Sequence, residues 1–554
     1  MKLFAEHLLV AFFFLGMLFI GPGAYLDHHL AHDVPYGYGA SDAFQHQTRA
    51  QAIKDAGHFR FDPAYISKSL EGIEGRYPPV LYHSAIGLSV ASGLAVYDAI
   101  YILVLLCCVV ACIAMYVLIR TYHKTIGLLS LPPMLLLFYF PASIGLYWGH
   151  WPSILAQAFL VLFFWAVSKT THERSYALIG GSLSIIALTH TSEAVFAGVF
   201  LACFFITSIL AKTLSKDQVK NIALGIGLAL MFASYYLVIF MNTWAKAQPY
   251  QFSIQSAWVG NPGFYLFSFG LLLIPLLIGL IIAVSKVSQP PIATIAGLAM
   301  LGAGFLNYAG FDVRAFQLRF FWPLYLAIFF GIGLYFLLKP LALKAGSIVN
   351  VCALALIALS VSGLISWPVI SQTEDYSIPS IPYVKSYGQG MMDAYHWQAF
   401  IWLSENTPPH SQIYFFYGDI YGNDALLRNT KRVHAQADPQ GFVQKIQERN
   451  ITPLFLSEIP GDNGGILAKR TGAFSFTDAV SEVPLEYFFG EKNICDFDYF
   501  VFDRQSGQQV LAQYNMLLAS KIEEQGGQVV FSNELIVIIK NTNTGGECIA
   551  QGTF

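Results

Sequence analysis

Long apolar runs separated by short polar loops dominate the first two thirds of the chain. A membrane-spanning helix needs about 20 apolar residues. About eleven runs approach that length, and they predict spans over 4–25, 97–119, 126–146, 152–168, 175–189, 193–211, 221–241, 263–285, 291–309, 321–338 and 346–367. The pattern therefore predicts a polytopic α-helical membrane protein over residues 1–370.

The pattern changes after residue 370. Residues 371–392 are rich in Ser, Pro, Gly and Tyr and are predicted to be a linker. Beyond it, helical patterns at 394–406, 440–449 and 509–524 alternate with the strand-like segments QIYFFYG, PLFLS, DYFVFD, QVVFS and ELIVIIK. Such alternation is typical of an α/β domain, which we expect over 393–554.

The distribution of charge supports the division into a membrane part and an α/β domain, and it predicts the orientation of the chain in the membrane. Only 12% of the residues are charged, against about 25% in soluble domains, and no basic tract points to nucleic acid. Lysine and arginine gather in alternate loops, as in the cytoplasmic loops of membrane proteins. These loops hold Arg120, Lys124, Lys169, Arg174, Lys212, Lys216, Lys220, Lys286, Lys339 and Lys344. The N-terminus is thus predicted in the cytoplasm, with loop 26–96 and the α/β domain outside the cell membrane.

The loop segment from Gly39 to Pro79 is the only long polar passage before residue 370. It predicts a helix over 42–56 with Ser41 as the N-cap. On that helix His46 and Arg49 follow Asp42 at i+4 and i+7 and share its face. A carboxylate here could deprotonate an acceptor hydroxyl or help to hold a divalent cation. The alternative is a helix-end carboxylate that interacts only with the helix dipole.

The segment closes on Tyr77-Pro78-Pro79, which is expected to stop one element and direct the next. Residues 80–95 are apolar but too short to span. Tyr77 is predicted to contact substrate.

Two arginines precede the span predicted over 321–338, on the side where the charge bias disfavours them. Arg314 and Arg319 carry planar guanidinium groups that match phosphate oxygens. They predict a site for a lipid phosphate, with Arg319 the stronger candidate. Contact with ordinary lipid headgroups is the alternative.

Three further ionisable residues stand at the outer ends of predicted spans: His150, His190 and Glu193. Ionisable side chains at membrane depth usually have a function. We expect His190 to contact phosphate, and His150 and Glu193 to contact sugar hydroxyls or phosphate.

Three sets of residues could bind a metal ion or form a disulfide. The cluster Asp27–Asp33 has histidines at metal-ligand spacing, but polar residues also gather where a helix leaves the bilayer. Asp496-Phe497-Asp498 has the form of a DxD motif, beside an apolar strand. The sequence therefore neither requires nor excludes a divalent cation, Mg²⁺ or Mn²⁺, as a cofactor. Cys495 and Cys548 could pair if the tail is outside the cytosol.

Together these features resemble the GT-C superfamily of polyprenyl-phosphate-dependent glycosyltransferases. Asp42, the helix after it and Tyr77-Pro78-Pro79 look like the branch that holds protein mannosyltransferases and aminoarabinose transferases. Asp42 with His46 resembles the oligosaccharyltransferase branch, and Arg319-Phe320 before a late span also fits. No WWDYG-like motif occurs in the tail, which argues against transfer to asparagine.

The resemblance implies an inverting glycosyltransferase. Asp42 would be the base, Arg319, Arg314 and His190 would hold the donor phosphate, and His46, Arg49, Tyr77, His150 and Glu193 would contact substrate. The implied partners are a polyprenyl-phosphate-linked sugar and a glycan, lipid or protein acceptor in the cell envelope. A polytopic transporter or a polymer-export factor is the alternative, although no internal repeat of the kind common in transporters is found.

Overall fold

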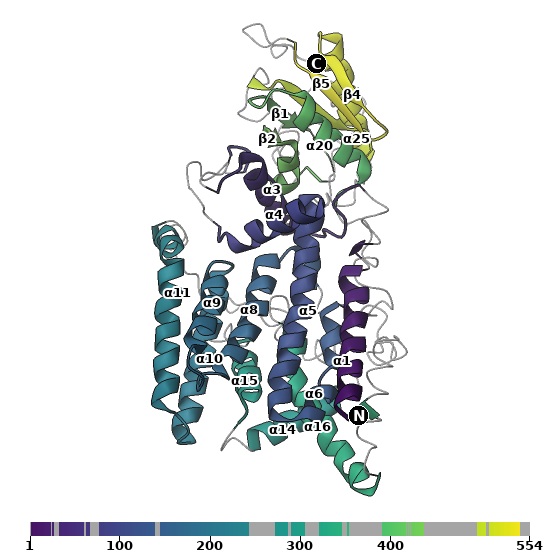
Figure 1. Cartoon of the computed structure of the whole chain (residues 1–554). Coiled ribbons are helices and arrows are strands. Elements are labelled where there is room, and N and C mark those ends of the chain that lie inside the picture. Colours follow the sequence, from purple (N-terminus) through teal and green to yellow (C-terminus); the bar gives the residue numbers. More distant parts are fainter. Residues whose placement is uncertain are drawn as a thin grey trace, which may run out of the picture. The chain divides into compact units, whose positions relative to one another are not determined.

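A computed structural model of the chain describes residues 2–23, 25–26, 33–59, 63–66, 77–138, 144–242, 272–285, 290–304, 321–345, 352–353, 391–416, 418, 420–421, 423–436, 496–505 and 509–542. The chain divides into two compact units (Figure 1). The membrane unit comprises Met1–Ala31 and Glu74–Gly388, and the α/β unit comprises His32–Ile73 and Gln389–Phe554.

The membrane unit is helical throughout its described part. Its elements are α1 (Lys2–Leu18), the π-helical η1 (Phe19–Gly23), α4 (Val80–Ser92), α5 (Val96–Tyr122), α6 (Lys124–Leu129), η2 (Pro132–Phe138), α7 (Ile144–Trp148), α8 (Trp151–Val167), α9 (Ser175–Ala187), α10 (Thr191–Leu210), α11 (Lys216–Asn242), α14 (Leu273–Ser285), α15 (Ile292–Gly304) and α16 (Trp322–Ala345). Five of the described helices are long and apolar enough to cross a membrane. The chain is thus an integral membrane protein, and the number of eleven spans stays a prediction because 346–367 lies almost wholly outside the described residues.

One predicted span is wrong as a continuous helix. The described residues of the run 126–146 belong to α6, the 3₁₀ helix η2 and the short α7 instead. Pro132 and Pro133 begin η2, and because proline has no amide hydrogen it cannot continue the hydrogen-bond ladder of an α-helix. The apolar run was long enough to span, but two adjacent prolines divide it.

Helix α5 lies among the other helices and contacts α1, α4, α6, α8, α15 and α16 (Figure 1).

The backbones of helices α14 and α16 lie in direct contact. A Cβ placed on Gly279 would lie 1.7 Å from the Phe329 carbonyl oxygen, and one on Gly333 would lie 1.7 Å from that of Pro275. The two backbones therefore touch through glycines, as small residues allow in membrane helix pairs.

The described strands of the α/β unit form a five-stranded sheet in the order β2-β1-β3-β5-β4. Strand β1 (Gln412–Phe415) pairs in parallel with β2 (Val433–Gln436) and β3 (Tyr499–Asp503). Antiparallel pairs join β3 to β5 (Ile536–Lys540) and β5 to β4 (Gln528–Ser532). The other elements are α20 (Ala394–Asn406), α21 (Asp424–Leu427), η7 (Arg428–Thr430) and α25 (Gln509–Glu524).

The helices over 394–406 and 509–524 and the strands within QIYFFYG, DYFVFD, QVVFS and ELIVIIK are confirmed. Strand β2 was not predicted from the sequence. The predicted strand PLFLS, the predicted helix 440–449, and Cys495 and Cys548 lie outside the described residues.

The helix predicted over 42–56 is confirmed as α3 (Ser41–Ala56). Ser41 is its first residue and not its N-cap, which is the extended Ala40. Helix α3 packs against α21, and the Asp55 carboxylate pairs with Lys431 Nζ at 2.6 Å. Met391 N–H donates to the Tyr38 carbonyl at 2.9 Å. Part of the first loop is thus fastened to the C-terminal residues.

A buried histidine holds α20 against β3. His396 is 5% exposed; its Nδ1 lies 2.5 Å from Asp393 Oδ2 and its Nε2 lies 3.2 Å from Asp503 Oδ2. Burial opposes the imidazolium charge, but the carboxylates of Asp503 and Asp393 outweigh it and raise the pKa of His396 to about 10. The charged ring bridges the N-cap of α20 and the end of β3.

We expect this bridge to make the α/β unit less stable in alkali. A raised folded-state pKa contributes stability in full below the unfolded value near 6.5, and the contribution is lost as pH rises through about 10. Pulse proteolysis of the tagged C-terminus from pH 6 to pH 10.5 should show that loss. His396→Gln should be less stable at neutral pH and should lack the decline, whereas the exposed His410→Gln should behave as wild type. The same decline in His396→Gln would contradict the assignment.

Candidate functional site

A chain of buried hydrogen bonds joins the starts of α8, α10 and α16 within the membrane unit. Ser153 Oγ donates to Glu193 Oε1 at 2.5 Å. Gln157 Nε2 donates to Ser153 Oγ at 3.1 Å and to Glu193 Oε1 at 3.4 Å. Gln157 Oε1 accepts from the Phe321 amide at 2.6 Å. We call these four residues, with His190, the polar network.

His190 and Glu193, both selected from the sequence, pair with each other in this network. His190 is the N-cap residue of α10, and its Nδ1 contacts the other carboxylate oxygen of Glu193, Oε2. Glu193 is fully buried, whereas the His190 side chain is 28% exposed. Because Nδ1 is held by Glu193, Nε2 is the ring nitrogen that can meet a ligand. Through Nε2 the pair can accept a proton as the neutral ring, or donate a hydrogen bond to an anion as the imidazolium.

Ser153 and Gln157 were missed in the sequence, although both are buried. The signal for Gln157 was available, since an amide inside an apolar run must find a partner. Its partners Glu193 and Phe321 are 36 and 164 residues away in sequence, and no local pattern identifies them.

A second buried carboxylate, also missed, stands in the first turn of α5. Asp98 is 2% exposed and accepts from the Tyr25 hydroxyl at 3.0 Å. The Tyr25 and Tyr101 rings meet edge to face, and Tyr101 also contacts Trp151. His150 directly precedes that tryptophan as the N-cap residue of α8. This aromatic group therefore joins the starts of α5 and α8.

The three residues selected on the polar loop lie on one helix but differ in exposure. Asp42 is exposed in the first turn of α3, whereas His46 and Arg49 are buried. Asp42 is thus the one whose carboxylate reaches solvent. Because α3 is part of the α/β unit, its residues and those of the polar network belong to different units.

The structure describes only some of the other residues that were selected from the sequence. Tyr77 is half-buried ahead of Pro79, the N-cap residue of α4, and the Val80 amide donates to the Leu188 carbonyl at 3.0 Å. Arg314, Arg319 and the cluster residues 27–32 lie outside the described residues. In the described part of the chain, no group of three or more His, Cys, Asp or Glu could hold a metal ion.

Asp498 of the DxD-like sequence has a structural contact. Its Oδ2 accepts from the Gln412 amide at 2.8 Å, and its own amide donates to the Gln412 carbonyl at 2.9 Å. These bonds join the beginning of β1 to that of β3. Asp496, two residues earlier, is exposed.

We expect the Glu193 carboxylate to stabilise the membrane unit. In Glu193→Ala, the donors on Ser153, Gln157 and His190 lose their shared acceptor, which should lower the free energy of unfolding by about 3 kcal/mol. Thermal unfolding of the detergent-purified protein, followed by size-exclusion chromatography, measures this loss. Glu173→Ala removes an exposed carboxylate of the same unit and should change nothing. Equal melting of the two variants would contradict the role of the network.

No protein-family model matches the chain, and no curated protein matches its sequence. Solved structures do resemble it. ArnT from Cupriavidus metallidurans bound to undecaprenyl phosphate has 11% sequence identity and a TM-score of 0.54, over 98% of each chain. The oligosaccharyltransferase of Archaeoglobus fulgidus, tethered to an acceptor peptide, has 13% identity and a TM-score of 0.55, over 92% of this chain and 72% of that one.

A further structure of that archaeal enzyme, AglB, in complex with an inhibitory peptide and a dolichol-phosphate, has 12% identity and a TM-score of 0.53. It covers 94% of this chain and 72% of its own. At such identities the likeness shows the fold. The expected resemblance to the GT-C superfamily is therefore confirmed at the level of the fold.

Proposed function

We propose that the chain is an inverting glycosyltransferase that moves a sugar from a polyprenyl-phosphate donor to an acceptor hydroxyl on the extracytoplasmic face of the cell membrane. The shared fold supports this, because one structural neighbour has undecaprenyl phosphate bound and another has dolichol-phosphate bound. The observation that carries the proposal is the polar network, which places a partly exposed imidazole among buried polar groups at the ends of apolar helices.

The donor phosphate is assigned to His190, Arg319 and Arg314. As an imidazolium, His190 donates to the phosphate through Nε2 while its Nδ1–H is bonded to the Glu193 carboxylate. Arg319 comes two residues before Phe321, whose amide is bonded to Gln157 in the network. A guanidinium group is suited to two phosphate oxygens at once. As the bond to the sugar breaks, these donors stabilise the charge that develops on the departing phosphate.

The acceptor is assigned to Asp42. Its carboxylate is exposed at the first turn of α3 and takes the proton of the acceptor hydroxyl. The hydroxyl oxygen then attacks the anomeric carbon on the side opposite the phosphate, the glycosidic bond forms, and the carbon–phosphate oxygen bond breaks. Attack from the opposite side inverts the anomeric configuration. Tyr77 and His150 are proposed to bind sugar hydroxyls, and His46 and Arg49 to support the helix that carries Asp42.

The reaction can be tested with the full chain in lipid nanodiscs. Labelled polyprenyl-phosphate sugars are supplied together with a fraction of cell-envelope glycans, lipids and proteins as acceptors. We expect the label to leave the polyprenyl lipid and to appear in a new glycoside of inverted configuration. If sealed vesicles instead take up labelled substrate and no glycosidic bond forms, the chain is a transporter and the proposal is wrong.

A further inference from the structure

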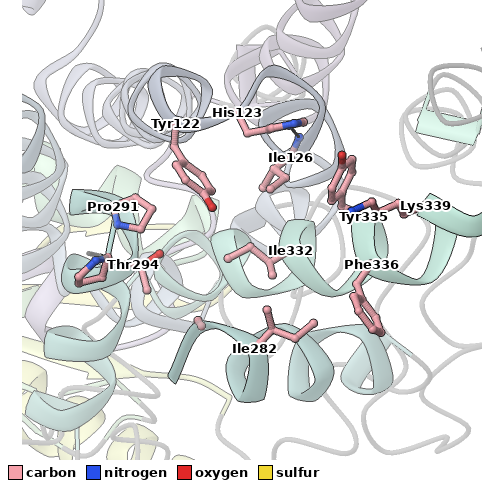
Figure 2. A pocket seen from close by; sticks show the side chains of 12 residues that line it. Tyr122, His123, Ile126, Ile282, Pro291, Thr294, Ile332, Tyr335, Phe336 and Lys339 are labelled. Atoms are coloured by element: carbon pink, nitrogen blue, oxygen red, sulfur yellow. Dashed lines mark hydrogen bonds between the residues drawn. The ribbon is translucent and has the colours of Figure 1, made fainter. Parts of the chain in front are cut away.

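A cavity with a partly polar lining lies in the membrane unit, away from the polar network. Its volume is about 320 Å³, and it is enclosed by α5, α6, α14, α15 and α16 (Figure 2). Lys339, one of its lining residues, follows Phe321 of the network by 18 residues on α16, about 27 Å of helix. The two places therefore lie toward opposite ends of α16.

One wall holds a buried hydroxyl that lacks a partner. Thr294 is 1% exposed, and among the described residues its Oγ1 has no hydrogen-bond partner. Leaving a buried hydroxyl unsatisfied costs about 1–3 kcal/mol, so a ligand oxygen in the cavity would remove that cost. Thr294 is also the third residue of α15, after Pro291. The Thr294 amide already donates to the Pro291 carbonyl at 2.9 Å, so the start of α15 contributes through the positive end of its helix dipole, which favours an anion.

The opposite wall supplies a cation and a further donor. Lys339 and Tyr335 stand across the cavity from Thr294 and Tyr122 (Figure 2). His123 Nδ1 accepts from the Ile126 amide at 3.3 Å, which leaves the ring proton on Nε2. The described residues that line the cavity include no Asp or Glu. The polar lining is thus suited to a negatively charged group rich in oxygen atoms.

The remaining lining of the cavity is apolar, and it continues onto the exposed face of α16. Ile282 and Ile332 lie between the polar walls (Figure 2). Phe336, also in the lining, is 57% exposed, and the neighbouring Leu337 is 44% exposed. An occupant can therefore keep a charged group in the cavity and lay an apolar chain along exposed apolar side chains. A free phosphate would leave that apolar part of the site unused.

We propose that this cavity binds the phosphate headgroup of an anionic membrane lipid, held by Lys339, Thr294 and the start of α15. The lipid is a constituent of the bilayer and not the sugar donor, whose phosphate is assigned to the polar network. The inference does not depend on glycosyl transfer, because neither the cavity nor its test involves a sugar.

The test is lipid binding to the full chain by native mass spectrometry. Detergent-purified protein is titrated with phosphatidylglycerol, with phosphatidylcholine and with soluble glycerol phosphate. We expect one phosphatidylglycerol to bind most tightly, and Lys339→Gln to bind it about tenfold more weakly, as for loss of a hydrogen bond to a charged group. Thr294→Val should also weaken binding. Thr294→Ser, which keeps the hydroxyl, and Lys220→Gln, which removes an exposed lysine on α11, should bind as wild type.

Two outcomes would overturn the proposal. If Lys339→Gln and Thr294→Val retain phosphatidylglycerol as well as Lys220→Gln does, the lipid binds elsewhere. If glycerol phosphate or phosphatidylcholine competes on equal terms with phosphatidylglycerol, the cavity does not select an anionic lipid. Thermal unfolding of each variant without added lipid checks that all of them are folded, and Thr294→Val is close enough in shape to keep α15 intact.

Discussion

Asp42→Asn should abolish glycosyl transfer, with a loss of about 10³-fold in rate, while the protein stays folded in the membrane. General-base catalysis contributes about 10²–10⁴-fold, and an amide cannot take a proton from the acceptor hydroxyl. Asparagine has nearly the same shape as aspartate, so α3 should remain intact. The rate of formation of the inverted glycoside in nanodiscs measures the effect.

A matched control lies on the same helix. Asp55→Asn makes the same chemical change at the other end of α3, where the carboxylate pairs with Lys431 at 2.6 Å. That pair is partly exposed and contributes about 0–1 kcal/mol, so activity should stay close to wild type. If Asp42 only stabilised its helix, its replacement would cost at most about 1 kcal/mol and transfer would persist. Near-normal activity of Asp42→Asn would therefore exclude Asp42 as the base.

Local patterns were sufficient for most described helices. The boundaries of α20 were predicted to the residue from a helical pattern that ends ahead of Pro408-Pro409. The structure shows why the start is well defined: Asp393 accepts from the amides of Tyr395 and His396 at 2.9 Å. A cap of this kind is a local feature, so it can be recognised in the sequence.

Hydropathy alone failed where backbone chemistry decides the structure. The run over 126–146 is apolar enough for a span, but Pro132 and Pro133 divide it. Strand β2 was missed because VHAQ is only four residues long and two of them, His434 and Gln436, are polar. Its pairing with β1 supplies the hydrogen bonds that its own sequence does not signal.

Individual residues of the candidate site could be predicted from the sequence, but the contacts that join them could not. His190 and Glu193 could be selected because ionisable groups are costly at membrane depth. Their link through Ser153 and Gln157 to the Phe321 amide depends on contacts between segments up to 164 residues apart. Such contacts follow from helix packing, which periodicity does not encode. The placement of α3 with the C-terminal residues likewise depends on long-range contacts, such as the Asp55–Lys431 pair.

Arg319→Gln should lower kcat/KM for the polyprenyl-phosphate donor by about 10²–10³-fold, since it removes a fixed positive charge from the departing phosphate. Phe321, two residues later, is anchored by its hydrogen bond to Gln157 at 2.6 Å, so the change should leave the start of α16 in place. Arg319→Lys should recover part of the rate, because lysine keeps the charge but lacks the planar fork. Steady-state kinetics with varied donor concentration measures both variants.

A measurement of donor binding distinguishes the proposed role of Arg319 from a purely structural one. Photo-crosslinking with a polyprenyl-phosphate analogue that carries no sugar reports the phosphate site without any transfer. It should fail in Arg319→Gln and persist in Asp42→Asn, because the two side chains are assigned to different substrates. Arg174→Gln, which removes an exposed arginine from the loop before α9, should keep both crosslinking and transfer. If Arg319→Gln is crosslinked as efficiently as Arg174→Gln, another residue must hold the phosphate. His190, which Glu193 already orients, would then be the next residue to replace.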